Sequence, residues 1–219
     1  MISTVSRMRA PGKPLLLGII ALCTLIEAAC LLTEIVPFGS WNLRNLLLGY
    51  GAFWPDLLHG SQPVYAFQPA LMFVTYGFLH GGLLHLVFNM MTLWMLGRVV
   101  IARSSALHFS VIYLLSLLGG GACYGLLHSE SWPMVGASGA LFGLAGAIVL
   151  WIWRAQPALS ASLAATWKIF AFLLLYNVVM YFALAGGLAW EAHLGGFLAG
   201  WVVAWIWPRR GPKGGSRSV

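Results

Sequence analysis

The chain has 219 residues, of which 60% are apolar and only 8% are charged, and its mean hydropathy is +0.86. In soluble domains about a quarter of the residues are charged. This composition therefore excludes an ordinary soluble protein and indicates an integral membrane protein. The net charge of +7 is expected to reflect membrane topology and not nucleic-acid binding, because no basic cluster is interleaved with exposed aromatic residues. The three cysteines lie in apolar runs and have no disulfide or metal-site spacing.

Six apolar stretches are predicted to span the membrane, separated by segments rich in proline, glycine and polar residues. They cover residues 15–36, 82–101, 106–127, 138–153, 167–185 and 191–207. We therefore expect an all-α membrane protein, built as a six-transmembrane-helix bundle. A single membrane domain over residues 15–207 is expected between two cytoplasmic basic tails, at 1–14 and 208–219.

The longest segment between spans covers residues 37–79 and mixes many aromatic side chains with prolines. Aromatic residues concentrate where a membrane protein meets the membrane–water interface, and loops of this length usually have a function. We expect a long interfacial loop between helices 1 and 2, with residues 43–50 as a candidate interfacial helix. Glu27 interrupts the first span and should face the protein interior or water, because a carboxylate is costly in lipid.

The charged residues separate by side in a six-span topology. All lysines and arginines except Arg44 fall on the side of the two termini, whereas Glu34, Asp56, Glu130 and Glu191 fall near the other side. By the positive-inside rule both termini are cytoplasmic. This charge bias and the small size predict a multi-pass protein of a bacterial inner membrane.

Ser138 opens the fourth predicted span, in the stretch Gly136-Ala137-Ser138-Gly139-Ala140-Leu141-Phe142-Gly143, and follows a polar run. A helix over 138–153 is about 24 Å long, and the hydrocarbon core is about 30 Å thick, so Ser138 should lie several ångströms below the outer surface. Backbone at that depth must pack in protein or line a water cavity. The alternative is a small-residue helix-packing motif in which serine is only a filler.

A serine hydroxyl needs a base to act as a nucleophile, and His193 opens the sixth predicted span. Gly196 and Gly200 share its helical face and would let another helix approach closely. A hydrogen-bonded core histidine is the alternative. Glu191 is the only acid near His193 in sequence and points to another side of the helix, so we predict a Ser138–His193 dyad without an acid.

His85 and Asn89 are four residues apart and share one face of the second span. Both can donate hydrogen bonds to a developing oxyanion, together with the backbone N–H of Ser138 at its helix N-terminus. The alternative is a polar pair that holds two helices together. His80 is expected to support the fold, and His59, His108 and His128 are interpreted as ordinary.

Three motifs, in this order and spacing, resemble the rhomboid family of intramembrane serine proteases over roughly residues 67–205. They are His80-x4-His85-x3-Asn89, Gly136-x-Ser138-Gly139 and Ala192-His193-x2-Gly196. The resemblance implies a six-helix bundle with Ser138 as nucleophile, His193 as general base, and His85 and Asn89 as oxyanion donors. Structural support then falls to His80, Gly136, Gly139, Phe142 and Gly196.

The family also implies transmembrane protein substrates, cut near their outer ends without a metal or other cofactor. The fifth span resembles its lateral gate. Two departures stand out: Leu71-Met72 replaces a frequent Trp-Arg pair, which leaves the anchoring of the loop open, and Phe142 replaces a frequent tyrosine. The sequence leaves the oligomeric state open.

Two other functions compete with a protease. A non-catalytic relative would bind transmembrane helices as a chaperone or adaptor, but such relatives typically lack the serine or the histidine. A small transporter or channel would be expected to carry paired broken repeats or a charged pathway, and neither is present in the sequence.

Overall fold

The computed structural model describes residues 12–36, 42–128, 130–183 and 186–207, and it is helical apart from turns and one isolated β-bridge. The basic tails, except residues 12–14, lie outside the described residues. The helices in chain order are α1 (Lys13–Ile35), α2 (Leu43–Gly51), η1 (Pro55–Leu58), α3 (Gln68–Thr75), η2 (Tyr76–Phe78), α4 (Leu83–Arg103), α5 (Ala106–Leu127), α6 (Ser138–Trp153), α7 (Leu159–Ala183) and α8 (Trp190–Ile206).

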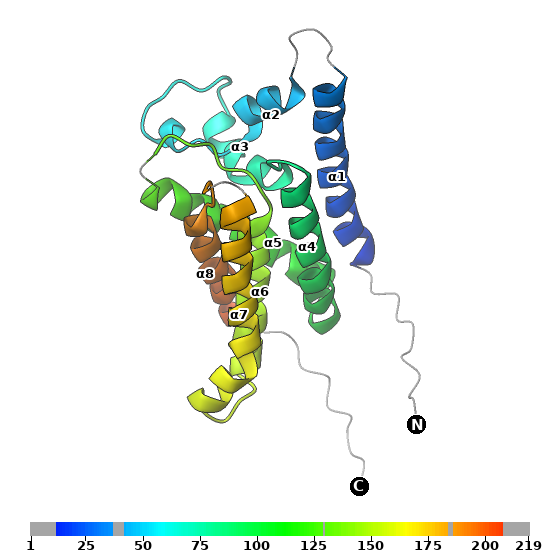
Figure 1. The fold of residues 1–219 in the computed structure, drawn as a ribbon. Coiled ribbons are helices and arrows are strands. Elements are labelled where there is room, and N and C mark those ends of the chain that lie inside the picture. The colour runs from blue at the N-terminus through cyan, green and yellow to red at the C-terminus, as the bar shows by residue number, and fades with distance from the viewer. Residues whose placement is uncertain (1–11, 37–41, 129, 184–185, 208–219) are drawn as a thin grey trace.

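Four of the described helices, α1, α4, α5 and α7, are long and apolar enough to cross a membrane. Helices α6 and α8 are apolar but shorter, with 16 and 17 residues. Almost every residue of α6 is buried, because α4, α5, α7 and α8 all pack around it. A helix that is apolar on all sides can be buried among other helices, and α6 is the central helix of this bundle. Helix α1 lies at the edge, beside α4 (Figure 1).

The predicted helix bounds agree with the structure at five of the six spans. The predictions for α5 and α6 match, and those for α1, α4 and α8 differ by no more than two residues at either end. The prediction for α7 was wrong at its start, because the helix begins at Leu159 and not at residue 167. The extra turns are rich in alanine and leucine, which are good helix formers. The hydroxyls of Ser162 and Thr166 also bond to the carbonyl oxygens four residues earlier, which removes two polar groups from solvent.

The segment between α1 and α4 folds into α2, η1, α3 and η2, at the end of the bundle where α1 ends and α4 begins (Figure 1). The helix expected over residues 43–50 is present as α2. Phe53 is fully buried and packs edge-on against Phe73 with ring centroids 4.9 Å apart. Phe53 also exchanges two 2.9 Å backbone hydrogen bonds with Met134, in the loop before α6. The segment therefore holds the loop that leads to Ser138.

Arg44 of α2 ties this segment to the bundle. Its guanidinium binds both oxygens of Glu27 at 2.9 Å and a carboxylate oxygen of Glu34 at 2.6 Å, and it donates to the carbonyl oxygen of His80 at 2.7 Å. The hydrogen bonds to Glu27 and Glu34 raise the pKa of Arg44 further above its ordinary value. The Glu27 side chain is 1% exposed, so it faces the protein interior as expected.

Helices α6 and α8 touch through their backbones. A Cβ added at Gly196 would collide with the carbonyl group of Gly139, and one added at Gly200 would collide with the carbonyl group of Gly143. Such close contact requires glycine at both of these positions of α8. It brings the first turn of α6 against the first turn of α8.

Candidate active site

Helices α4, α6 and α8 all begin at the end of the bundle that carries α2 and α3 (Figure 1). Their first turns hold three of the side chains singled out in the sequence, His85, Ser138 and His193. Residues far apart in the chain are thus neighbours at one end of the molecule.

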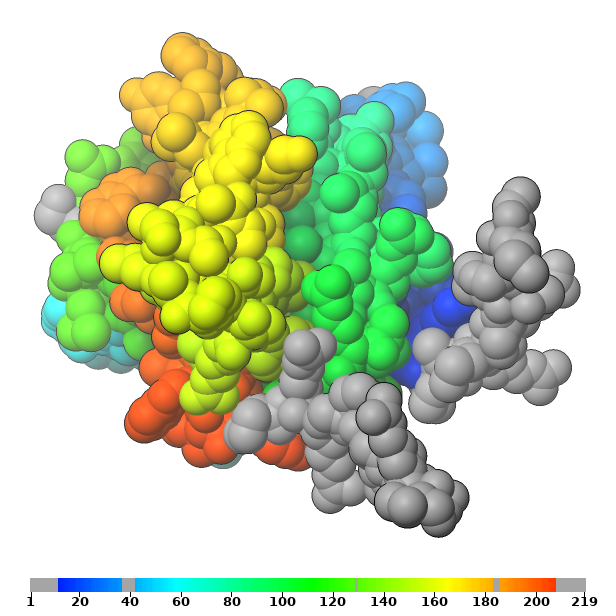
Figure 2. All heavy atoms as spheres, turned by 90° about the horizontal axis from the view of Figure 1, so that it is seen from below, coloured from blue at the N-terminus to red at the C-terminus, as the bar shows by residue number. Residues whose placement is uncertain are grey.

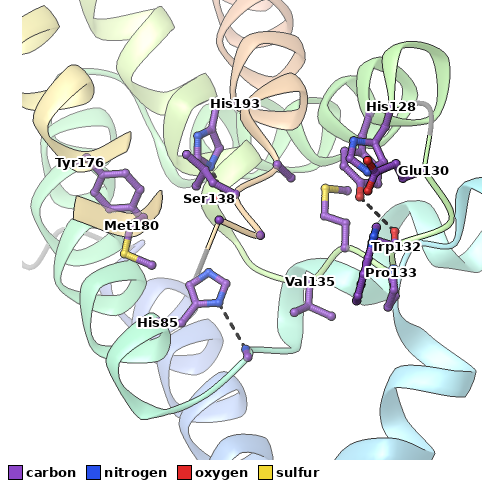
Figure 3. Close-up of a pocket in the computed structure, with 17 residues that line it drawn as sticks. His85, His128, Glu130, Trp132, Pro133, Val135, Ser138, Tyr176, Met180 and His193 are labelled. Atoms are coloured by element: carbon purple, nitrogen blue, oxygen red, sulfur yellow. Dashed lines mark hydrogen bonds between the residues drawn. The ribbon is translucent and has the colours of Figure 1, made fainter. Parts of the chain in front are cut away.

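Ser138 and His193 are in direct contact. The Oγ of Ser138 lies 2.8 Å from Nε2 of His193, which is a hydrogen bond between the two side chains (Figure 3). His193 is 3% exposed, whereas Ser138 is half-buried. A hydroxyl bonded to an imidazole nitrogen is the arrangement that a nucleophile and its general base require.

The His193 ring is held by two aromatic side chains and at its second nitrogen. Phe142 stacks flat on it, with centroids 4.1 Å apart and planes 4° apart, and Tyr176 packs edge-on at 6.1 Å. Nδ1 lies 2.7 Å from Oδ1 of Asn177, a residue of α7 that the sequence reasoning did not single out. A lone amide in an apolar span was the signal that could have found it. Glu191 does not contact His193, because it binds Nδ1 of His128 at 3.0 Å.

His85 lies against the loop before Ser138. Gly136 has a φ of 123°, and a Cβ there would be 2.8 Å from Cε1 and Nε2 of the His85 ring. Nδ1 of His85 accepts a 3.3 Å hydrogen bond from the backbone N–H of Gly81, which leaves the hydrogen of the neutral ring on Nε2. Figure 3 shows His85 pointing from α4 toward Ser138, with the dashed line marking the bond from Gly81 to its other ring nitrogen. His85 is thus a neutral donor next to the serine.

Asn89 is placed differently from His85. It is fully buried one turn further along α4, and Nδ2 donates to the carbonyl oxygen of His85 at 2.9 Å. One amide hydrogen remains, although Asn89 does not belong to the described residues that line the cavity. The backbone N–H of Ser138 begins α6, where Ala137 provides no side-chain cap. It is one of the free donors of a helix N-terminus.

His80 supports His85 from behind. Its ring is 3% exposed and meets the His85 ring edge-on, with centroids 5.2 Å apart. Burial and the neighbouring His85 lower the pKa of His80 to about 3, so this ring is neutral at physiological pH. The backbone carbonyl oxygen of His80 accepts the 2.7 Å hydrogen bond from Arg44, which ties this residue to α2.

Ser138, His85 and His193 line one cavity of about 530 Å³. Tyr176 and Met180 of α7 form one end of it, and His128, Glu130 and Trp132 lie at the other (Figure 3). His128, to which the sequence analysis gave no special role, therefore lines this cavity. The described residues contain no group of three His, Cys, Asp or Glu side chains that could hold a metal ion.

A model of the Rhomboid domain matches residues 68–210. The chain belongs to the rhomboid family. The resemblance read from the three motifs is thereby confirmed, and with four long apolar helices it makes this rhomboid an integral, multi-pass membrane protein.

Curated relatives show the same membership. This rhomboid is 33% identical over 137 residues to RHOMBOID-like protein 5 of Arabidopsis thaliana. The aligned region covers 58% of this chain and 41% of that protein. It is 28% identical over 209 residues to Rhomboid protease GlpG of Yersinia pestis (strain Pestoides F), which covers 95% of this chain and 67% of the relative. The same figures hold for the GlpG protein of Yersinia pseudotuberculosis serotype O:3 (strain YPIII). The chain thus spans less than half of the plant protein and about two thirds of the bacterial ones.

Proposed function

We propose that this rhomboid is a serine endopeptidase that hydrolyses peptide bonds of transmembrane-helix substrates through a Ser138–His193 dyad. The observation that carries the proposal is the 2.8 Å contact between Ser138 Oγ and His193 Nε2 inside a cavity of about 530 Å³. The names of the Yersinia relatives, rhomboid proteases, support the same reaction class.

In this mechanism Ser138 Oγ attacks the carbonyl carbon of the scissile bond while His193 Nε2 takes the hydroxyl proton. The tetrahedral intermediate collapses when His193 returns that proton to the leaving amine, which leaves an acyl-enzyme on Ser138. Water from the cavity then adds to the acyl carbon, with His193 again as the base. No step requires a metal or an organic cofactor.

The negative charge on the substrate oxygen needs hydrogen-bond donors close to Ser138. Nε2–H of His85, which lies against Gly136 just before α6, and the backbone N–H of Ser138 at the start of α6 fit this role. Neither has a hydrogen-bond partner among the described residues. The remaining amide hydrogen of Asn89 is the third proposed donor. Its other hydrogen already holds the carbonyl oxygen of His85, so Asn89 also keeps the first turn of α4 in shape.

We further propose that all six helices expected from the sequence cross the membrane, with both termini in the cytoplasm of a bacterial cell. The shorter α6 and α8 then end below the surface, and the start of α6 at Ser138 lies on the outer side, where a substrate helix is cut near its outer end. The orientation is tested by adding a protease to inverted membrane vesicles that contain the protein with a tag at each terminus. Cytoplasmic termini face outward in such vesicles, so we expect both tags to be digested. Tags that stay protected inside the vesicles would contradict the proposed orientation.

A fluorophosphonate probe tests the nucleophile. We expect an adduct on Ser138, found by mass spectrometry, that disappears in Ser138→Ala and falls by at least about a hundredfold in rate in His193→Ala. Exposed Ser160 and His59 provide matched controls, because Ser160→Ala and His59→Ala should label like the wild type. A protein that folds but never labels would act as a helix-binding chaperone or adaptor, and the proposal would fail.

A further inference from the structure

Asn177 connects α7 to the base of the proposed dyad. Its Oδ1 lies 2.7 Å from Nδ1 of His193, and its Nδ2 donates to the carbonyl oxygen of Leu173, one turn earlier, at 2.8 Å. The side chain is half-buried in an otherwise apolar stretch of α7. An amide inside a membrane helix is unfavourable unless both its ends are hydrogen-bonded, and here both are.

These two contacts fix the position of every proton along the chain of hydrogen bonds. A carbonyl oxygen can only accept, so the amide nitrogen of Asn177 must face Leu173 and its oxygen must face His193. That oxygen also only accepts, so Nδ1 of His193 must carry a hydrogen. In the neutral ring Nε2 is then unprotonated, and its lone pair faces the Ser138 hydroxyl.

We propose that Asn177 is a positioning residue, which holds His193 in the tautomer and orientation that the proposed proteolysis requires. The proposal rests on the proposed function and adds a third member to the predicted dyad, an uncharged amide in place of an acid. The His193 ring keeps the same Nδ1–H bond when it becomes an imidazolium, so the bond persists through both proton transfers.

The position of Asn177 also gives α7 a chemical role. Figure 2 shows the side chains of α7 (yellow) at the surface beside those of α4 (green), and α7 contacts α6 and, more sparsely, α4. Large apolar side chains of α7, including Leu174, Leu175 and Phe182, are exposed. A peripheral helix therefore supplies the partner of the central base, so the placement of α7 and the readiness of His193 are coupled.

Two variants separate positioning from packing. Asn177→Leu keeps the size of the side chain and removes the acceptor, whereas Asn177→Asp keeps an acceptor oxygen at the same place. For cleavage of a model transmembrane substrate in liposomes, we expect Asn177→Leu to lower kcat about a hundredfold while KM changes less than about twofold. Asn177→Asp should recover most of that loss. Asn45→Leu is the matched control, because Asn45 is exposed on α2 and should leave both constants unchanged.

The tautomer itself is measured by the 15N chemical shifts of the His193 ring, assigned by their loss in His193→Gln. We expect a protonated Nδ1 in the wild type and in Asn177→Asp, and a mixture of both tautomers in Asn177→Leu. Wild-type kcat and unchanged ring shifts in Asn177→Leu would overturn the proposal. The proposal would also be overturned if Asn177→Leu and Asn177→Asp lost the same amount of activity and the same amount of thermal stability. Asn177 would then be a packing residue.

This experiment also separates the two proposals. If the wild type cleaves no transmembrane substrate and takes no fluorophosphonate, the proposed function fails. The assignment of the hydrogen bond would still be supported if the wild type had a protonated Nδ1 on His193 and Asn177→Leu had a mixture of both tautomers. If the wild type is active and its Nδ1 is unprotonated, the proposed function stands and the role of Asn177 is wrong.

Discussion

Gly136 lies in the loop before Ser138, directly against the His85 ring of α4. Its φ of 123° favours glycine, its N–H donates to the carbonyl oxygen of Tyr76 at 2.9 Å, and its Cα faces the His85 ring. The absent side chain is what lets the proposed oxyanion donor approach the start of α6.

We predict that Gly136→Ala lowers kcat/KM at least about tenfold, because the new methyl group would push His85 away from Ser138. Gly60 provides the control, since its φ is 98° and a Cβ there would meet nothing within 4 Å. Both variants should lose about 1–2 kcal/mol of stability from the left-handed backbone, but only Gly136→Ala should lose activity. Equal activity in the two variants would contradict the placement of His85.

Some of the site follows from the sequence at the scale of single residues. An aromatic ring four residues after Ser138 lies one turn along the same helix face, so the stacking of Phe142 on His193 was predictable. The contact of Asn177 with His193 was not, because it depends on how α7 is rotated against α8, which no periodicity records. The ion pair between Glu27 and Arg44 was also missed. A buried carboxylate implies a cation, and Arg44 is the one lysine or arginine predicted on the side of the membrane opposite the termini.

At the scale of elements, Arg44 explains how the segment between α1 and α4 is held without the Trp-Arg pair that many family members carry. Leu71 is half exposed and Met72 is buried in the core, so neither provides a polar anchor. The single guanidinium instead joins α1, α2 and His80, three residues before the start of α4.

We predict that Arg44→Met destabilises the protein by about 3–5 kcal/mol, because it leaves the Glu27 carboxylate buried and unpaired. Glu34→Gln should cost less than about 1 kcal/mol, since that side chain is 32% exposed. Unfolding in mixed micelles measures both. The double variant Arg44→Met/Glu27→Met should recover part of the loss, and a double variant less stable than Arg44→Met alone would contradict this account.

Helix bounds were predictable where the sequence punctuates them. The polar run before Ser138 and the turn after Trp153 define α6, and Ser105 caps α5 by accepting from the N–H of His108. The start of α7 was predicted too late, because Pro157 and the serines after it are typical of the polar segments expected between spans. The hydroxyl of Ser162 instead bonds back to the carbonyl oxygen of Ala158, which satisfies it within a helix. Local composition could not settle this competition.

At the scale of the whole molecule, three helix starts meet at one end although their residues lie up to 108 positions apart, from His85 to His193. Counting spans predicts that they lie on one side of the membrane. It could not give the 2.8 Å contact, which depends on the backbone contact between α6 and α8 at Gly139 and Gly196. The Rhomboid domain match covers residues 68–210, which include all three of these helix starts.

Ser138 and His193 are proposed to cut transmembrane helices. The most direct test is to reconstitute the purified protein in liposomes with a panel of model transmembrane substrates and to identify the products by mass spectrometry. We predict cleavage near the outer end of the substrate helix, loss of all cleavage in Ser138→Ala and His193→Ala, and full activity in Ser160→Ala and His59→Ala. Cleavage that persists in Ser138→Ala, or a cut in the soluble part of the substrate, would contradict the account.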